Sequence, residues 1–162
     1  MSEAQIPKKL ILMAGIAGSG KTTLAKKEYP DYMRISLDDI KRSRSEMGSL
    51  IEAYKPDGLP VPASNNRKAE HVLIDNALQK GQNIIVDDTN LTRDIRRHHV
   101  LHAGKYGHVV HVIAFCNFER AKSQNKLRHG EECVPDGVVH KMQRDFESPR
   151  IEEGFESIRT IF

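Results

Sequence analysis

Residues 15–22 read GIAGSGKT, and this stretch decides how the rest of the chain is interpreted. It follows the apolar run LILMA at 10–14, which is typical of a strand buried on both faces. It precedes TLAKKE at 23–28, which suits a helix. Glycines at 15, 18 and 20 let the backbone turn so that successive N–H groups point inward. We therefore expect a tight glycine-rich turn between a strand and a helix, with Lys21 at its end.

The stretch fits the pattern G-x-x-x-x-G-K-[ST], the P-loop, in which inward N–H groups and a helix N-terminus attract phosphates. Lys21 is expected to reach the β- and γ-phosphates of a nucleotide, and the Thr22 hydroxyl is expected to hold Mg²⁺. The predicted ATP site comprises Gly15, Ala17, Gly18, Ser19, Gly20, Lys21, Thr22 and Thr23. A glycine-rich loop without a ligand is the alternative that this pattern leaves open.

The length of 162 residues predicts a single domain over residues 1–162. With 38% hydrophobic and 29% charged residues, the composition is that of a globular protein. The chain starts with polar residues and has no run of about eighteen apolar ones, so we expect a cytoplasmic protein without a membrane partner. Cys116 and Cys133 lie outside any C-x-x-C pattern and are expected to be free thiols.

The net charge of +3 does not by itself indicate a nucleic-acid ligand. The basic residues nevertheless gather in three clusters, at 41–44 (KRSR), at 93–99 (RDIRRHH) and at 126–129 (KLRH). Each cluster alone could be a solvated helix face. If all three met at one cleft, they would favour a polyanionic ligand.

Apolar runs and turn residues predict an alternation of strands and helices. Strands are expected at 9–14, 32–37, 83–87, 108–116 and 157–162, and helices at 20–28, from 38 onward, at 65–80, 92–106, 118–128 and 135–146. Asp38 is expected to cap its helix, and the proline-rich segment 55–62 is expected to be a surface loop. This alternation predicts an α/β fold, a parallel sheet of about five strands flanked by helices.

Carboxylates follow two of the predicted strands. Asp38 and Asp39 follow the second strand, and Asp87 and Asp88 follow the third. Because parallel strands end at one edge of a sheet, these groups are expected beside the P-loop. For Asp38 a plain helix cap, and for Asp87 and Asp88 a turn or a Walker B metal contact, remain open.

Three classes of P-loop protein compete. A GTP switch usually needs N-K-x-D, but residues 125–128 read NKLR. A motor or regulatory ATPase needs a carboxylate to orient hydrolytic water, yet residues 87–90 read DDTN, without a glutamate. A phosphotransferase needs a carboxylate for the acceptor hydroxyl and cations over the transferred group, which the strand-end carboxylates favour.

The segments GIAGSGKTT, ISLDDIKRS, IIVDDTNLT, NKLRHGEECVP and FESPRIEEGF resemble the P-loop kinase domain of phage-type polynucleotide 5′-hydroxyl kinase, in order and rough spacing from residue 8 to about 148. The resemblance implies an NMP-kinase-like fold with an arginine lid at about 124–135, without the fused phosphatase domain. It implies transfer of the γ-phosphate of ATP, as its Mg²⁺ complex, to the 5′-OH end of DNA or RNA.

The resemblance also implies roles for single residues. Asp38 would be the general base for the acceptor 5′-hydroxyl, and Arg128 would be the lid arginine that reaches over the ATP phosphates. Lys41 stands where the family often has an arginine that grips the acceptor's phosphate. Asp88 would orient that basic residue and, with Thr89 and Asn90, line the acceptor tunnel.

Two features outside the resemblance complete the expectations. Arg93 belongs to a basic helix, with Arg96 and Arg97, that is a candidate contact for a single strand. His98 and His102 are spaced as a helical metal pair, but no third ligand fits, so zinc is not expected. A kinase for a nucleoside, sugar or metabolite alcohol remains the main alternative to a polynucleotide kinase.

Overall fold

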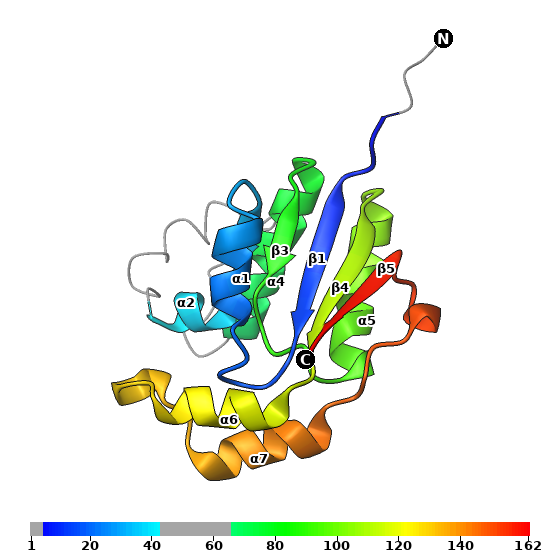
Figure 1. Cartoon of the computed structure of the whole chain (residues 1–162). Helices are drawn as coiled ribbons and strands as arrows, with labels where there is room; N and C mark the ends of the chain where they lie inside the picture. Colours follow the sequence, from blue (N-terminus) through cyan, green and yellow to red (C-terminus); the bar gives the residue numbers. More distant parts are fainter. Residues whose placement is uncertain (1–4, 43–65) are drawn as a thin grey trace.

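The computed structural model describes residues 5–42 and 66–162, which form a five-stranded sheet with every neighbouring pair parallel. The strands are β1 (Lys9–Ala14), β2 (Met33–Ile35), β3 (Ile84–Val86), β4 (Val109–Phe115) and β5 (Ser157–Ile161). Their order is β2-β3-β1-β4-β5, so the strand that leads into the P-loop lies in the middle (Figure 1). The predicted parallel α/β sheet is confirmed.

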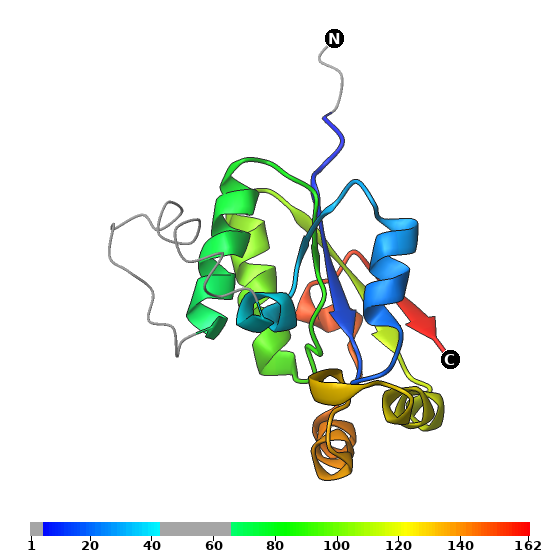
Figure 2. The ribbon, with the colours of Figure 1, turned by 90° about the vertical axis from the view of Figure 1, so that its left-hand side faces the viewer.

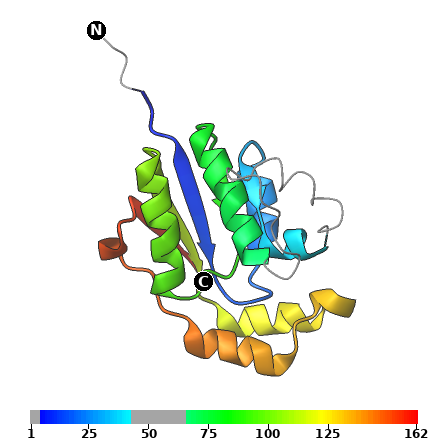
Figure 3. The same cartoon turned by 180° about the vertical axis from the view of Figure 1, so that it is seen from behind.

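Helices cover both faces of the sheet and the end where its strands finish. They are α1 (Lys21–Glu28), α2 (Leu37–Arg42), α4 (Asn66–Gln79), α5 (Arg93–Lys105), α6 (Phe118–Lys126) and α7 (Asp136–Asp145), with short 3₁₀ turns η1 (Gly130–Glu132) and η2 (Ile151–Glu153). Figure 2 shows α4 and α5 on one face and α1 on the other, and Figure 3 shows α4 and α5 in front of the sheet. Helices α6 and α7 lie beyond the carboxyl ends of the strands (Figure 1).

Successive side chains of β1 point to opposite faces of the sheet, so β1 contributes to the core on both faces. Leu10 and Leu12 pack with Leu73 and Ala77 of α4, whereas Ile11 and Met13 pack with Ala25 of α1. A strand buried on both faces needs an unbroken apolar sequence, which is why residues 10–14 were recognisable. The central strand is therefore rigidly placed, and the P-loop leaves it from a fixed point.

Predicted helix ends are mostly within one or two residues of the observed ones. Thr92 caps α5 by accepting the N–H of Ile95 at 3.3 Å, and Gly107 follows α5 with φ +74°. The prediction that Asp38 is the cap of its helix is wrong: α2 begins at Leu37, and the Ser36 hydroxyl accepts the N–H of Asp39 at 3.4 Å. Asp38 therefore lies inside the first turn. The proline-rich segment 55–62 lies outside the described residues.

Two further expectations concern cysteines and membranes. Cys116 and Cys133 are both free. Each helix in the described part of the chain is too short or too polar to cross a membrane.

Candidate active site

The P-loop lies tightly against α6. Gly18 has φ +84°, and a Cβ at this position would lie 2.2 Å from the carbonyl oxygen of Ala121. Gly20, with φ +89°, stands at the start of α1. Only glycine has both the backbone freedom and the missing side chain that this approach demands. The loop that opens α1 is thus fixed between the sheet and α6.

Lys21 folds over this loop. Its Nζ donates to the carbonyl oxygens of Ile16 at 2.8 Å and Gly15 at 3.1 Å, and Ser19 Oγ also donates to Ile16 at 2.6 Å. Burial lowers the pKa of Lys21 to about 8, because a buried ammonium loses its hydration.

Four charged side chains from different segments also influence the Lys21 amine. Asp87, Asp88 and Asp38 raise its pKa, and Arg128 lowers it, although burial has the largest effect. Such interactions fall off with distance, so these groups lie near the Lys21 amine. The P-loop lysine therefore has three carboxylates, Asp38, Asp87 and Asp88, and the Arg128 guanidinium near its amine.

Asp87 links the start of α1 to β2. Its Oδ2 accepts the Thr22 hydroxyl at 2.6 Å and pairs with Arg34 Nη1 at 2.7 Å, and its side chain is 2% exposed. Arg34 also pairs with Asp39 of α2. Asp87 Oδ2 therefore has two donors, the Thr22 hydroxyl of α1 and the Arg34 guanidinium of β2. Arg34 was not singled out from the sequence, although a charged residue inside an otherwise apolar strand is a signal.

Asp38 is exposed in the first turn of α2. The N–H of the preceding residue, Leu37, donates to Asp88 Oδ1 at 2.8 Å, so the segment after β3 fixes the start of this helix. The Asp38 carboxylate is therefore accessible while its helix is held in place.

The basic group beside Asp88 is Arg67 of α4. Arg67 Nη1 lies 3.9 Å from Asp88 Oδ2 and 3.2 Å from Glu70 Oε1. Lys41, which the resemblance assigns to this place, is exposed on α2. Arg67 and Glu70 were not singled out from the sequence. Glu70 could have been found, because it shares the apolar stripe of Leu73, Ile74 and Ala77.

Thr89 and Asn90 connect the segment after β3 to the P-loop. The Thr89 carbonyl accepts the N–H of Gly15 at 2.9 Å, and Asn90 Nδ2 donates to the carbonyl of Met13 at 2.7 Å. Asn90 is 1% exposed and has φ +41°, so its amide serves the fold. Thr89 is half-buried, so its side chain is the more accessible of the two.

The basic cluster on α5 does not face solvent as a unit. Arg93 and Arg97 are exposed, but Arg96 is completely buried. Arg96 Nε and Nη2 donate to the Glu153 carboxylate at 2.9 and 3.1 Å, and Nη1 donates to the carbonyls of Asn90 and Leu91. The expectation that Arg96 shares a nucleic-acid face is therefore wrong, because Glu153 neutralises it. Of the first basic cluster, Ser43 and Arg44 lie outside the described residues.

The predicted lid region joins α6 to α7. The Asn125 side chain donates to the carbonyl of Val134 at 2.7 Å and accepts its N–H at 3.0 Å, which closes this connection. Arg128 is exposed, and its Nη1 donates to the carbonyl of Glu132 at 3.4 Å. The arginine is thus held on a short loop at the edge of the site.

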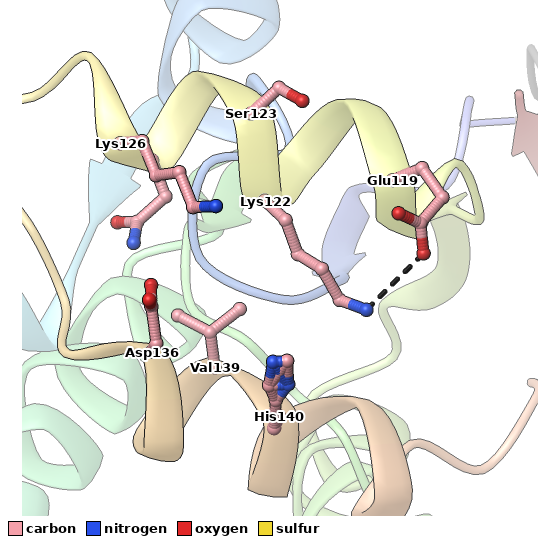
Figure 4. Close-up of a pocket in the computed structure, with 8 residues that line it drawn as sticks. Glu119, Lys122, Ser123, Lys126, Asp136, Val139 and His140 are labelled. Atoms are coloured by element: carbon pink, nitrogen blue, oxygen red, sulfur yellow. Dashed lines mark hydrogen bonds and ion pairs between the residues drawn. The ribbon is translucent and has the colours of Figure 1, made fainter.

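A separate pocket of about 240 Å³ lies between α6 and α7. Its lining residues are Glu119, Lys122, Ser123, Asn125, Lys126, Asp136, Val139 and His140. Figure 4 shows Lys122 and Lys126 facing Asp136 and His140 across it, with Lys122 paired to Glu119 at 3.2 Å. The P-loop and the strand-end carboxylates do not line this pocket, so it is distinct from the site around Lys21.

Four histidines gather between α4 and α5. The rings of His71 and His98 stack at 3.9 Å, those of His98 and His102 lie 4.2 Å apart, and His99 is buried beside them. Within residues 5–42 and 66–162, no set of three His, Cys, Asp or Glu side chains is arranged to hold a metal ion.

Comparisons with known proteins agree with the fold. A family model described as "AAA domain" matches residues 10–149. A protein of Acanthamoeba polyphaga mimivirus, named for bifunctional polynucleotide phosphatase/kinase, is 26% identical over 95% of this chain. The chain spans about a third of the length of that relative, 33%.

Solved structures share the fold at low identity. A fungal RNA kinase has a TM-score of 0.63 and 11% identity, covering 98% of this chain and 77% of its own. A gluconokinase from Sinorhizobium meliloti 1021 has a TM-score of 0.59 and 17% identity, covering 98% and 83%. The fold is that of P-loop kinases.

Proposed function

This chain belongs to the family described as AAA domain, and we propose that it acts as an ATP-dependent polynucleotide 5′-hydroxyl kinase. It would transfer the γ-phosphate of ATP to the 5′-OH end of DNA or RNA. The observation that carries the proposal is the gathering of Asp38, Asp88 and Arg128 around the Lys21 amine. A phosphotransferase needs a carboxylate and cations around its transferred group.

The P-loop residues fit a triphosphate with Mg²⁺. The loop leaves no room for a side chain at Gly18, and Lys21 lies over its carbonyls with a lowered pKa. A phosphate chain offers that amine a negative partner in place of two carbonyls. Thr22, aligned by Asp87, would hold the ion, which supplies charge neutralisation when bound.

Asp38 is proposed as the group that takes the proton of the acceptor hydroxyl. It is exposed on a helix whose start is tied to Asp88, so its position is set although its oxygens are accessible. General-base help of this kind contributes about 10²–10⁴-fold to a rate. Arg128 would stabilise negative charge on the transferred group, and α6 with α7 would limit water access.

The acceptor is proposed to enter past α2 and α4. Lys41 and Arg67 would attract the acceptor's phosphate, with Arg67 held by Asp88 and Glu70. Thr89 would line the entry, with Asn90 buried behind it on the carbonyl of Met13, and exposed Arg93 on α5 would meet the strand further out. A nucleic-acid end carries several phosphates, so such a basic approach assists its capture.

The name of the mimivirus relative supports a polynucleotide acceptor, and the gluconokinase fold keeps a small alcohol as the alternative. The two differ in their dependence on salt. Oligonucleotide binding weakens steeply as salt rises because counterions are released, whereas a neutral sugar or nucleoside should show little dependence.

The deciding experiment is transfer of labelled phosphate from ATP to a panel of 5′-OH oligonucleotides, nucleosides and sugars. We expect labelling of the 5′-OH oligonucleotides, none of the same strands with a 5′-phosphate, and a KM that rises with salt. Lys41→Ala should raise that KM several-fold with kcat little changed, and exposed Lys27→Ala is the matched control. Preferred labelling of a small alcohol would overturn the polynucleotide proposal in favour of the alternative.

A further inference from the structure

Glu70 is a buried acid that none of the proposed chemical steps uses. It lies on α4 and is 0% exposed. Its Oε1 accepts from Arg67 at 3.2 Å, whereas its Oε2 has no N–H or hydroxyl partner in the described part of the chain. A buried carboxylate oxygen without a donor is strongly disfavoured.

Asp88 also has a buried carboxylate oxygen without a close donor. Its Oδ1 accepts the N–H of Leu37, and within the described residues its buried Oδ2 has no hydrogen-bond donor other than the distant Arg67 at 3.9 Å. The two carboxyls are neighbours: Arg67 Nη1 lies 3.2 Å from Glu70 Oε1 and 3.9 Å from Asp88 Oδ2, and each acid shifts the pKa of the other. Two ionised carboxylates in contact repel each other, but a single proton between them satisfies both orphan oxygens.

We propose that Glu70 is a positioning residue that keeps its proton and donates it to Asp88 Oδ2, and so fixes the first turn of α2, on which Asp38 lies. The link runs from Glu70 to Asp88, and from Asp88 Oδ1 to the Leu37 N–H. The position of the proposed base, Asp38, therefore depends on the proton that Glu70 and Asp88 share. This inference rests on the proposed function only for the role of Asp38.

The groups around the pair decide which acid keeps the proton. Burial and the neighbouring Asp88 raise the pKa of Glu70 to about 9, although Arg67 lowers it. Asp88, whose pKa burial also raises, is stabilised as the anion by its hydrogen bonds from Glu70 and the Leu37 N–H. Glu70 therefore holds the proton at neutral pH.

Other charged groups face the pair from the elements packed around it. Asp87, after β3, acts on Asp88 and is itself neutralised by Arg34 of β2. Asp88 also raises the pKa of Lys21 on α1. On the α5 side, His98 and His99 lie against His71, the neighbour of Glu70 on α4. Those imidazoles have lowered pKa values, so they are neutral wherever Glu70 titrates.

The test compares Glu70→Gln, whose amide N–H can donate to Asp88 but cannot titrate, with Glu70→Ala, which cannot donate. The matched control is Glu152→Gln, the same change at an exposed position. At saturating Mg·ATP and 5′-OH oligonucleotide, kcat of the native chain should fall as pH rises through about 9. Glu70→Gln should keep the neutral-pH kcat and lose that alkaline fall, while Glu70→Ala should lose at least tenfold in kcat with ATP affinity unchanged.

Two measurements on the nucleotide-free chain need no acceptor. The ¹³C shift of the Glu70 carboxyl should report a protonated acid at pH 7 that ionises near pH 9. Hydrogen exchange of the Leu37 amide should be slow in the native chain and Glu70→Gln, and faster in Glu70→Ala. An ionised Glu70 at pH 7, or equal Leu37 protection in all three, would overturn the inference. Loss of the oligonucleotide activity alone would overturn only the proposed function.

Discussion

At the scale of single residues, Lys21 is the clearest case of a group whose state depends on what binds. Its amine donates to two P-loop carbonyls, and burial lowers its pKa to about 8. A carbonyl is a weak partner for an ammonium compared with a phosphate dianion. The lysine is therefore prepared to gain a proton when phosphates replace the carbonyls.

Nucleotide binding at pH 8 should take up about half a proton, because Lys21 is half protonated there and phosphates raise its pKa. Because binding takes up a proton, ATP affinity should fall as pH rises through 8. Calorimetric titration in two buffers of different ionisation enthalpy measures the uptake. Lys21→Met should abolish it, and Lys27→Met, at the exposed end of α1, should not. Equal uptake in Lys21→Met would assign the proton to another group.

Asp38→Asn should lower kcat by about 10²–10⁴-fold with ATP affinity retained, since an amide cannot accept the hydroxyl proton. The control is Asp31→Asn, an exposed carboxylate in the turn before β2. Single-turnover transfer and nucleotide titration separate the two properties. Native turnover in the Asp38→Asn variant would remove the base from the proposed chemistry.

The P-loop residues could be read from the sequence because their chemistry depends on a contiguous pattern. Arg34 and Arg67 could not be assigned in the same way, since Asp39, Asp87 and Asp88, with which they pair, lie on other elements. Asn90 was assigned to the acceptor site from its sequence motif, but in the structure its amide donates to the carbonyl of Met13.

At the scale of elements, α5 shows how one helix divides its basic residues between two tasks. Arg96 ties α5 to η2 through Glu153 and to the segment after β3 through two carbonyls. Arg97, the next residue, is exposed. Adjacent residues on a helix point about 100° apart, so one arginine is structural while the other is exposed to solvent.

Arg96→Gln should reduce the free energy of unfolding by about 3–5 kcal/mol, because it leaves the Glu153 carboxylate buried without a cation. Arg97→Gln should change stability by less than about 0.5 kcal/mol. Urea denaturation measures both. If Arg97 meets a phosphate, its variant should also lower the salt slope of oligonucleotide binding by about one. Similar unfolding free energies for both variants would contradict the buried pair.

Element boundaries were predictable where local chemistry sets them. Thr92 before α5, Asn117 before α6 and Gly107 after α5 are local signals, and each accompanies the expected end. The start of α2 was misplaced because its first N–H bonds to Asp88, a residue far along the chain. Non-local hydrogen bonds of this kind leave no signature in a short window.

At the scale of the whole molecule, the chain places Lys21, Asp38 and Asp88 near one another and stacks His71, His98, His99 and His102, the histidine layer, between α4 and α5. The parallel sheet was predictable from the alternation of strands and helices. The P-loop showed which end of the sheet carries the candidate site. The stacking of His71 and His98 between α4 and α5 was not predictable, because periodicity shows which face of a helix is apolar but not which helix it meets.

This histidine layer should make the fold sensitive to acid. Burial lowers the pKa of His71 to about 4 and that of His99 to about 3, from 6.5. Between pH 6.5 and those values the unfolded chain binds more protons than the folded one. Stability is therefore complete above pH 6.5 and falls as pH decreases.

For His99 alone, which is 1% exposed with neither ring nitrogen hydrogen-bonded in the described part of the chain, the loss from pH 6.5 to 5 should be about 2 kcal/mol. His99→Phe removes the titrating group without removing a hydrogen bond, so its urea midpoint should fall less between pH 7.5 and 5. The same change at exposed His140 should leave the native pH dependence. If the His99→Phe midpoint falls as steeply as the native one, protonation of a group other than His99 sets the acid limit of the fold.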